Sequence, residues 1–383
     1  MDLTQAREIK AQLTGYARDL AERYEVAVGP QSAATTAPDP VRAPTLAIGV
    51  APAGRSGEFE IAVRYRLGLP AARAVVRRIA AEAGPSPDVR RTGRIRRLGP
   101  GRRGSTRDPG LDPQPPVATA LAVGETGRVR PLRPGVSLAH VDVTAGTLGA
   151  FVVADPACSA GGHLPGGPGA IYALSNRHVL DGVPGDGVLQ PGPADGGRDP
   201  VDRVGAVAAV VPLAAGERAA VDAAVALLDS AEVDPTYPVG PVTTTAEAVP
   251  GDAVEKIGRT TGHTHGRVSA VEMDDVLVGY GPELGVLAFD GQIEVESTGT
   301  GPFSRGGDSG SLVYRHDAAA LGLLFAGSET GGPHGTGLTY VNPIGAVVGA
   351  LGVRLVGAAG QDHTGQDHTG TGERASPSGT NTL

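Results

Sequence analysis

Short apolar runs, each closed by turn residues, dominate the chain between residues 135 and 355. Examples are AIYALSN, GAVAAVVPL, VDAAVALLD and SGSLVYR. Strands separated by turns give this pattern, whereas βαβ units would place helix-period segments between the strands. The composition agrees, because the 383 residues include 59 glycines and 32 prolines. The pattern predicts an all-β sandwich or barrel in this region, followed by one helix in the segment NPIGAVVGALGV.

The first part of the chain has a different pattern. Residues 3–24 place apolar side chains at three- and four-residue spacing, which predicts an amphipathic helix. A hairpin over 46–67, a second helix over 70–83 and a basic strand, DVRRTGRIRRL, are expected to follow. Together these elements predict a small α+β N-terminal domain over residues 1–97.

Two further segments lack the pattern of a packed core. Residues 98–130 begin with a stretch rich in Gly, Pro and Arg, so we interpret them as a linker or exposed loop. Residues 357–383 contain QDHTG twice in tandem and then polar residues, which is typical of a disordered tail. The all-β domain is then expected to span residues 131–356.

Cysteine content and the amino-terminal sequence bear on the compartment. Cys158 is the single cysteine, which excludes an intramolecular disulfide. The start, MDLTQAREIKAQL, lacks a basic segment followed by an apolar one, as a secretory signal would have. No run approaches the roughly 18 apolar residues that a membrane span needs. We therefore expect a soluble, cytoplasmic protein without a membrane partner.

Charge is distributed unevenly along the chain. The formal net charge of −8 argues against a nucleic-acid-binding role for the whole protein. Arginines nevertheless cluster in the segment 72–107. They form either a solvated helix face with a polar linker, or an interface for an acidic partner, a nucleic acid or a neighbouring subunit. The basic strand also makes the N-terminal domain a candidate surface for a homo-oligomer.

The segment FSRGGDSGSLV, residues 303–313, is the sharpest chemical motif. A serine hydroxyl is a weak nucleophile, so acyl transfer needs a neighbouring base and hydrogen-bond donors for the developing oxyanion. Glycines before Ser309 let the backbone turn, so that the N–H groups of Gly307 and Ser309 can point into one cavity. These two groups are the predicted oxyanion hole.

Two further motifs supply the partners that such a serine needs. His178 follows an apolar strand in LSNRHVLDG and is the candidate general base. Asp222 opens the apolar run VDAAVALLD, where a buried carboxylate is costly without a partner. Holding the imidazole in one tautomer would provide that partner. Asp229, at the far end of the same run, is the reserve candidate.

The order His178, Asp222, Ser309 resembles that of the trypsin- and chymotrypsin-like serine proteases. Further motifs resemble the disulfide-free bacterial and plant Narrow Leaf-type trypsin-like proteins: KIGRTTGHTHGRV, LGLLFAG and YVNPIGAVVGALGV. The resemblance covers about 220 residues and implies a chymotrypsin-like double β-barrel with a C-terminal helix. It implies a Ser-His-Asp catalytic triad that requires no metal or organic cofactor.

The resemblance also implies residues that contact substrate. Phe303 stands where digestive proteases have the floor of the specificity pocket, and Arg305 lies near the nucleophile. The strand LGLLFAG would line the cleft and pair with an extended peptide, through the residues Phe325, Ala326 and Gly327. His263 and His265 are expected to shape the cleft rather than bind a metal, because the sequence shows no carboxylate or cysteine near them.

The sequence thus predicts a serine endopeptidase acting on proteins or peptides through an acyl-enzyme. One alternative is a catalytically silent binding or scaffold protein on the same fold. Another is a protease that acts mainly on its own segment 98–117. An α/β-hydrolase is discounted, because Ser311 occupies the place of the second glycine in the G-x-S-x-G elbow.

Overall fold

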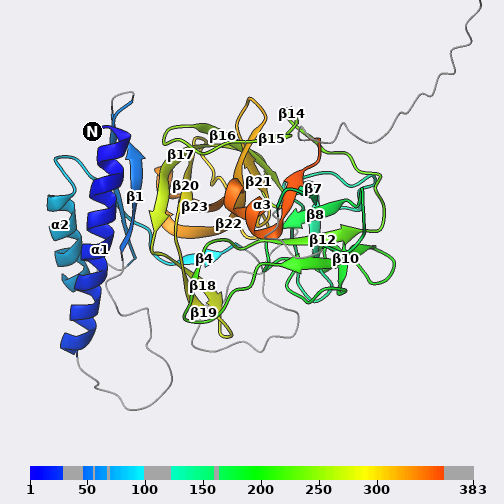
Figure 1. Ribbon diagram of the computed structural model, residues 1–383, viewed down its shortest axis with the longest axis horizontal. Helices are drawn as coiled ribbons and strands as arrows, with labels where there is room; N and C mark the ends of the chain where they lie inside the picture. The colour runs from blue at the N-terminus through cyan, green and yellow to red at the C-terminus, as the bar shows by residue number, and fades with distance from the viewer. Residues whose placement is uncertain (29–45, 55–56, 67–69, 99–121, 159–163, 358–383) are drawn as a thin grey trace, which may run out of the picture.

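The computed structural model has three parts that lie side by side (Figure 1). Two bodies of β-structure are adjacent, and the helices α1 and α2 lie at one end of the molecule beyond β1. The structure describes residues 1–28, 46–54, 57–66, 70–98, 122–158 and 164–357. Among the helices in these ranges, none is long and apolar enough to cross a membrane.

Six strands close into a barrel in the C-terminal half. The circuit runs β16-β17-β20-β23-β22-β21 and returns to β16, with every neighbouring pair antiparallel. Alternate apolar side chains fill its interior, among them Val268, Val295 and Leu324. The bounds are β16 Ala253–Gly258, β17 Gly262–Asp274, β20 Gln292–Ser297, β21 Leu312–Tyr314, β22 Ala319–Gly331 and β23 Gly337–Pro343.

A second sheet of eight strands curls beside this barrel in the order β24-β7-β8-β12-β10-β9-β5-β6. The helix α3 (Ile344–Leu351) leaves the closed barrel and leads into β24, so the chain ends its described course in the other sheet. The bounds are β5 Ser137–His140, β6 Gly146–Thr147, β7 Ala150–Ala154, β8 Tyr172–Ser175, β9 Gly187–Leu189, β10 Arg203–Val210, β12 Ala224–Leu228 and β24 Val353–Leu355.

The two β-bodies are joined by a buried ion pair. Asp195 ends the short 3-10 helix Pro193–Asp195 of the curled sheet, and the Arg259 guanidinium donates to both of its carboxylate oxygens. Both side chains are fully buried. A bidentate arginine–carboxylate pair fixes orientation as well as distance. The ion pair therefore sets the relative position of the elements that meet between the two bodies.

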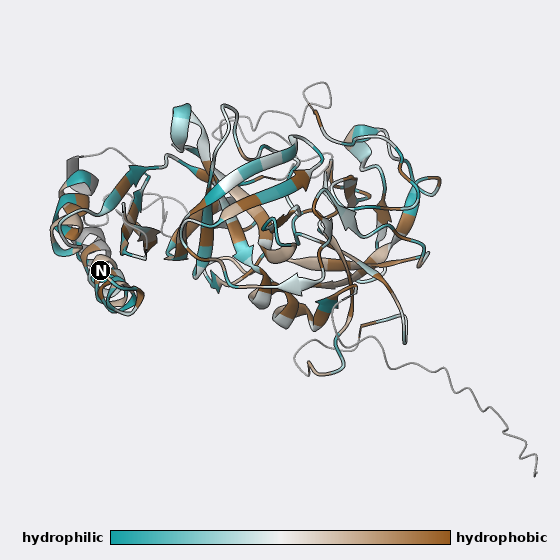
Figure 2. Ribbon diagram, turned by 90° about the horizontal axis from the view of Figure 1, so that it is seen from above, coloured by the Kyte–Doolittle hydropathy of each residue, from teal (hydrophilic) through white to brown (hydrophobic). Residues whose placement is uncertain are grey.

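The N-terminal segment adds strands to the closed barrel. Its helices α1 (Leu3–Val28) and α2 (Pro70–Glu82) pack apolar residues such as Leu13 and Ile79 against the strands. Both helices present hydrophilic residues on other faces (Figure 2). The strands are β1 Leu46–Pro52, β2 Phe59–Tyr65 and β3 Asp88–Arg91, and β1 pairs antiparallel with β17. The β1-β2-β3 group therefore continues the sheet of the closed barrel.

A fourth strand, β4 (Ile95–Arg97), leaves this segment and enters the closed barrel's sheet. It pairs antiparallel with β22 on one side and parallel with β18 (Val276–Gly281) on the other. The strand β18 in turn pairs with β19 (Gly285–Phe289), which meets β11 (Arg218–Ala219). Short pairs outside these bodies are β13 Thr236–Tyr237 with β14 Gly240–Pro241, and β15 Thr244–Thr245 with β22.

Buried and half-buried arginines of the N-terminal segment contact acids of the barrel. The Arg64 guanidinium on β2 donates to Glu294 at 2.8 Å and to Asp88 at 2.7 Å, and the side chains of Arg64 and Glu294 are almost completely buried. Arg90 contacts Glu296 at 2.6 Å. Burial lowers the pKa of Arg64, but the charge of Glu294 outweighs it, so the pKa lies above its ordinary value. These arginines thus find acidic partners within the chain.

The predicted fold class, a double β-barrel with a C-terminal helix behind a small α+β segment, is confirmed. The domain division at residues 97 and 130 stays a prediction. The segment 99–121 of the predicted linker and the tail from residue 358 lie outside the described residues. The predicted basic strand is two strands, β3 and β4, separated by a turn at Gly93, whose φ is +67°.

Candidate active site

His178 and Asp222 are brought together by one strand pair. The strand β8 ends at Ser175 and β12 begins at Ala224, and these two residues are register partners. The segments just beyond them therefore lie side by side. The imidazole Nδ1 of His178 lies 2.5 Å from Asp222 Oδ2, and the His178 backbone N–H donates to Asp222 Oδ1 at 3.2 Å. The carboxylate is therefore placed to fix both the ring and the backbone of His178.

Asp222 is fully buried and receives further hydrogen bonds from distant parts of the chain. The Tyr280 hydroxyl donates to its Oδ2 at 2.5 Å. The Asp222 backbone N–H donates to Asn342 Oδ1 at 2.9 Å, and Asn176 Nδ2 donates to its carbonyl at 2.7 Å. Nothing in the sequence marks Tyr280 for this position. Its strand β18 reaches Asp222 only through the fold.

These contacts decide the ionisation of the carboxyl group. Burial raises the pKa of Asp222, but the nearby His178 and the hydrogen bonds from His178 and Tyr280 lower it by more, so the pKa lies below its ordinary value. Burial and the Asp222 charge together raise the pKa of Tyr280 well above its usual value. Asp222 is thus an acceptor near neutral pH, and Tyr280 is a neutral donor.

Ser309 lies against the strand that leads to His178. Its carbonyl accepts a hydrogen bond from the Thr147 N–H at 2.8 Å. At the next residue, a Cβ placed on Gly310 would lie 2.2 Å from the hydroxyl oxygen of Ser175, the last residue of β8. Because Gly310 also has a φ of +92°, this close approach requires glycine. The nucleophile candidate is therefore held next to the end of β8.

The hydroxyl of Ser309 points to a backbone carbonyl in this structure. Its Oγ donates to the Phe325 carbonyl at 3.5 Å. Within the described residues, His178 Nε2 is buried and has no hydrogen-bond partner. The structure thus brings His178 and Asp222 into direct contact and leaves the serine–histidine hydrogen bond unformed. Rotation about one side-chain bond of Ser309 redirects the hydroxyl.

The loop before Ser309 presents a backbone donor. The Gly306 carbonyl accepts from the Thr260 hydroxyl at 2.8 Å, which directs the N–H of Gly307 the opposite way because the peptide bond is planar and trans. Gly307 has a φ of +98°, and a Cβ there would lie 2.3 Å from the Thr260 Oγ1. Its N–H donates to the carbonyl of Leu98 at 2.7 Å. The predicted donor Gly307 thus binds a peptide carbonyl.

A buried ion pair between Lys256 and Asp308 holds the same loop in place. Asp308 accepts hydrogen bonds from the backbone N–H groups of Thr260, Thr261 and Arg305 at 2.9–3.1 Å. The Lys256 ammonium lies 3.6 Å from Asp308 Oδ2, and both side chains are fully buried. Burial lowers the pKa of Lys256 although Asp308 opposes that change. Sequence reasoning missed this ion pair, because Lys256 lies inside an otherwise ordinary strand.

The predicted substrate residues take different positions. Phe303 is buried in the core of the closed barrel, at 1% exposure. The Arg305 side chain is exposed, and within the described residues it makes no ion pair or hydrogen bond. Phe325, Ala326 and Gly327 lie on β22 and are register or hydrogen-bond partners of residues 96–98. Residues 96–98 of the chain thus occupy the place along β22 where the sequence analysis expected a substrate peptide to pair.

Leu98 directly follows β4 and is hydrogen-bonded to the loop that precedes Ser309. Its backbone N–H donates to the Phe325 carbonyl at 2.9 Å, and its carbonyl accepts from the Gly307 N–H. A Cβ placed on Gly327 would lie 3.0 Å from the Leu98 side chain, so that side chain covers Gly327. Leu98 also packs against the apolar cluster that contains Phe303. Sequence reasoning gave Leu98 no role.

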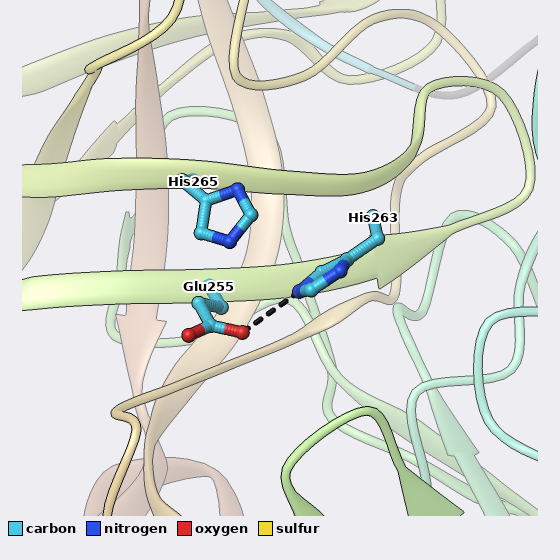
Figure 3. Close-up of side chains that lie close together, drawn as sticks. All are labelled: Glu255, His263 and His265. Carbon is cyan, nitrogen blue, oxygen red and sulfur yellow. Dashed lines mark hydrogen bonds and ion pairs between the residues drawn. The ribbon is translucent and has the colours of Figure 1, made fainter.

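His263 and His265 lie on β17 beside Glu255 of β16 (Figure 3). His263 Nε2 lies 2.7 Å from Glu255 Oε2, and one ligand atom from each of the three side chains falls within 4.8 Å of the others. The sequence argument that no carboxylate lies near these histidines is wrong, because the hairpin register places Glu255 opposite His265. Both histidines are exposed, and the absence of a metal role stays a prediction.

Comparisons with known proteins give structural neighbours only. No family model matches the sequence, and no curated protein matches it significantly. Among solved structures, the chain is similar to Thermobifida fusca protease A, with 21% identity, a TM-score of 0.40, and 59% of this chain and 98% of that chain covered. For Nocardiopsis protease the values are 18%, 0.40, 58% and 98%. For Cellulomonas bogoriensis chymotrypsin they are 20%, 0.39, 59% and 98%.

Proposed function

We propose that the chain is a serine endopeptidase that cleaves protein or peptide substrates through an acyl-enzyme. In this proposal Ser309 is the nucleophile, His178 is the general base and Asp222 orients the imidazole. The single observation that carries the proposal is the position of the Leu98 carbonyl. A peptide carbonyl is hydrogen-bonded to the Gly307 N–H, two residues before Ser309. The residue after Ser309, Gly310, lies against Ser175 at the end of β8, three residues before His178.

The proposed reaction follows from these contacts. The Asp222 carboxylate holds the proton of His178 on Nδ1, which leaves Nε2 free to accept the proton of the Ser309 hydroxyl. Ser309 Oγ attacks the carbonyl carbon, and the N–H groups of Gly307 and Ser309 stabilise the oxyanion. The protonated imidazole then donates its proton to the leaving amine. Water, activated by the same imidazole, hydrolyses the acyl-enzyme.

Acylation by a fluorophosphonate probe tests the assignment of the nucleophile. Wild type should be labelled and Ser309→Ala should not. Ser304→Ala is the matched control, because that hydroxyl lies in the same loop and contacts Thr339 Oγ1 at 2.7 Å instead of the cleft. It should be labelled like wild type. A wild type that is labelled together with a Ser309→Ala variant that is labelled equally would refute the proposal.

A catalytically silent binding protein is the second candidate. The observation that favours it is the unformed hydrogen bond between Ser309 and His178, since Ser309 Oγ is directed to the Phe325 carbonyl. Catalytic hydrogen bonds often tighten only when substrate binds, so an open link is compatible with either candidate. A folded wild-type chain that binds peptides but neither hydrolyses them nor reacts with the probe would favour the binding protein.

Other predictions about the biology of the chain remain open to direct measurement. The cytoplasmic location stays a prediction. The homo-oligomer through the N-terminal domain also stays a prediction, and sedimentation would test it. Within the described residues, the edge of β1 that faces away from β2 is paired with β17 of the same chain. A second copy could therefore not pair with this edge and would have to contact another part of the domain.

A further inference from the structure

We infer that the chain is its own substrate and that Ser309 cleaves the peptide bond on the carboxyl side of Leu98. The inference rests on the proposed function and names a substrate for it. Ile95 to Leu98 form an extended peptide that lies in the cleft with one carbonyl at the predicted oxyanion donor. The position of the backbone, the neighbours of the Leu98 side chain and the docking of the preceding domain each support it.

The backbone of this segment is bound as an extended peptide substrate is bound. It runs antiparallel to β22, with Arg96 and Arg97 opposite Gly327 and Ala326. The last hydrogen bonds of this ladder are the Leu98 N–H to the Phe325 carbonyl and the Leu98 carbonyl to the Gly307 N–H. Main-chain pairing of this kind supplies affinity for any extended peptide. The ladder ends at the carbonyl group that the predicted chemistry would attack.

The side chain of Leu98 has apolar neighbours. It lies over Gly327 and packs against the apolar cluster containing Phe303, Val295 and Leu324. Any other residue at position 327 would reach into the same space, since a Cβ there would lie 3.0 Å from a Leu98 methyl. These apolar neighbours favour a leucine-like side chain on the acyl side of the bond. A carboxylate there would lie against apolar side chains, and this partial burial of a charge is unfavourable.

The preceding domain keeps the segment in the cleft. The strand β4 is hydrogen-bonded on both of its edges, to β22 and to β18. The domain itself is anchored by the β1–β17 pairing and by the buried contact of Arg64 with Glu294. Attachment in the same chain replaces a bimolecular encounter with a high effective concentration. Cleavage is therefore intramolecular, and residues 1–98 stay bound as a product that fills the cleft.

The step balances with water as the only co-reactant. Ser309 Oγ forms a bond to the Leu98 carbonyl carbon and gives its proton to His178. The bond to the Gly99 nitrogen breaks, and that nitrogen takes the proton. Water then hydrolyses the ester, which restores Ser309. The products are a carboxylate at Leu98 and a new amino terminus at Gly99.

Intact mass and amino-terminal sequencing of the purified full-length chain test the inference. Wild type should yield residues 1–98 and a second fragment that begins at Gly99. Ser309→Ala should stay intact, also after incubation with wild type, because cleavage is intramolecular. Leu98→Asp should lower the cleavage rate at least about 100-fold, because it places a carboxylate against apolar side chains, whereas Leu98→Met should be cleaved like wild type. Val201→Asp is the matched control at a residue that is 69% exposed, and it should be cleaved like wild type.

Probe labelling of the same variants separates this inference from the proposed function. With the cleft less strongly occupied, Leu98→Asp should react with the fluorophosphonate faster than wild type does. An intact wild-type chain that is labelled at Ser309 would overturn self-cleavage and leave the endopeptidase standing. Cleavage at a different peptide bond would also overturn cleavage after Leu98 and leave the endopeptidase standing. So would cleavage of Leu98→Asp at the wild-type rate. If neither wild type nor folded Leu98→Asp is cleaved or labelled, both proposals fail.

Discussion

Replacement of Asp222 by Asn tests the role of the orienting carboxylate and leaves the other residues of the site unchanged. The carboxylate accepts from His178 Nδ1, the His178 N–H and the Tyr280 hydroxyl, so both of its oxygens are occupied by donors. An amide has nearly the same shape, but one of its two polar atoms is an NH2 donor. If that NH2 faces His178, the proton moves to Nε2, and the imidazole can no longer accept the Ser309 proton.

The expected cost is large. A wrong tautomer removes the base while the geometry is kept, and the corresponding substitution in a Ser-His-Asp triad lowers the rate about 10⁴-fold. At about 1.4 kcal/mol per tenfold, this is about 5.5 kcal/mol of transition-state stabilisation. The assay is the second-order rate of fluorophosphonate labelling near pH 7. The Leu98→Asp background serves here, so that the cleft is equally open in every variant.

Two variants make the test specific. Tyr280→Phe removes one of the three hydrogen bonds and leaves the tautomer alone, so it should cost about tenfold or less. Asp229→Asn replaces the reserve candidate at the other end of the same run and should label like its parent. Normal labelling by Asp222→Asn, or loss of labelling by Asp229→Asn instead, would refute the argument.

Three further changes test the rest of the site. Lys256→Met leaves the buried Asp308 carboxylate without its ammonium partner, so it should cost about 3 kcal/mol of folding stability in urea unfolding. No change in the unfolding midpoint would show that the ion pair is not needed. In the Leu98→Asp background, Gly307→Ala should lower hydrolysis of a fluorogenic peptide with the sequence of residues 94–98 at least about 100-fold, because its N–H must move. Gly281→Ala, with a similar positive φ and open space around it, is the control and should keep the rate. The lowered pKa of Asp222 means that its contribution to stability is complete above about pH 4. The melting-temperature difference between wild type and Asp222→Asn should therefore shrink as pH falls further, and a difference that grew would contradict the assigned direction.

The parts of the structure that were predictable are those in which local pattern and chemistry coincide. Short apolar runs closed by turn residues indicated the strands between residues 135 and 355, because Gly- and Pro-containing turns bound strands of this length. His178 and Asp222 each lie next to an apolar strand, where burial of a polar side chain is unfavourable unless it has a hydrogen-bond partner. The strand pairing of β8 with β12 then brings them to 2.5 Å.

The contacts that were not predictable depend on pairings between residues far apart in the sequence. Tyr280 reaches Asp222 from 58 residues away, and Lys256 reaches Asp308 from 52 residues away. Neither has a local signal, since a tyrosine or lysine in a strand is ordinary. Glu255 was overlooked beside His263 because a hairpin register, and not sequence distance, sets that contact. The strand β4 was predicted as part of a separate domain, and its place in the cleft follows only from pairing with β22.

The most direct test of the account is the position of the covalent adduct in the chain. Full-length wild type and Leu98→Asp would be treated with the fluorophosphonate, digested and mapped by peptide mass spectrometry. The account predicts a single adduct, on Ser309, in the peptide that contains GGDSGS. An adduct on a different hydroxyl, or none on folded Leu98→Asp, would contradict it.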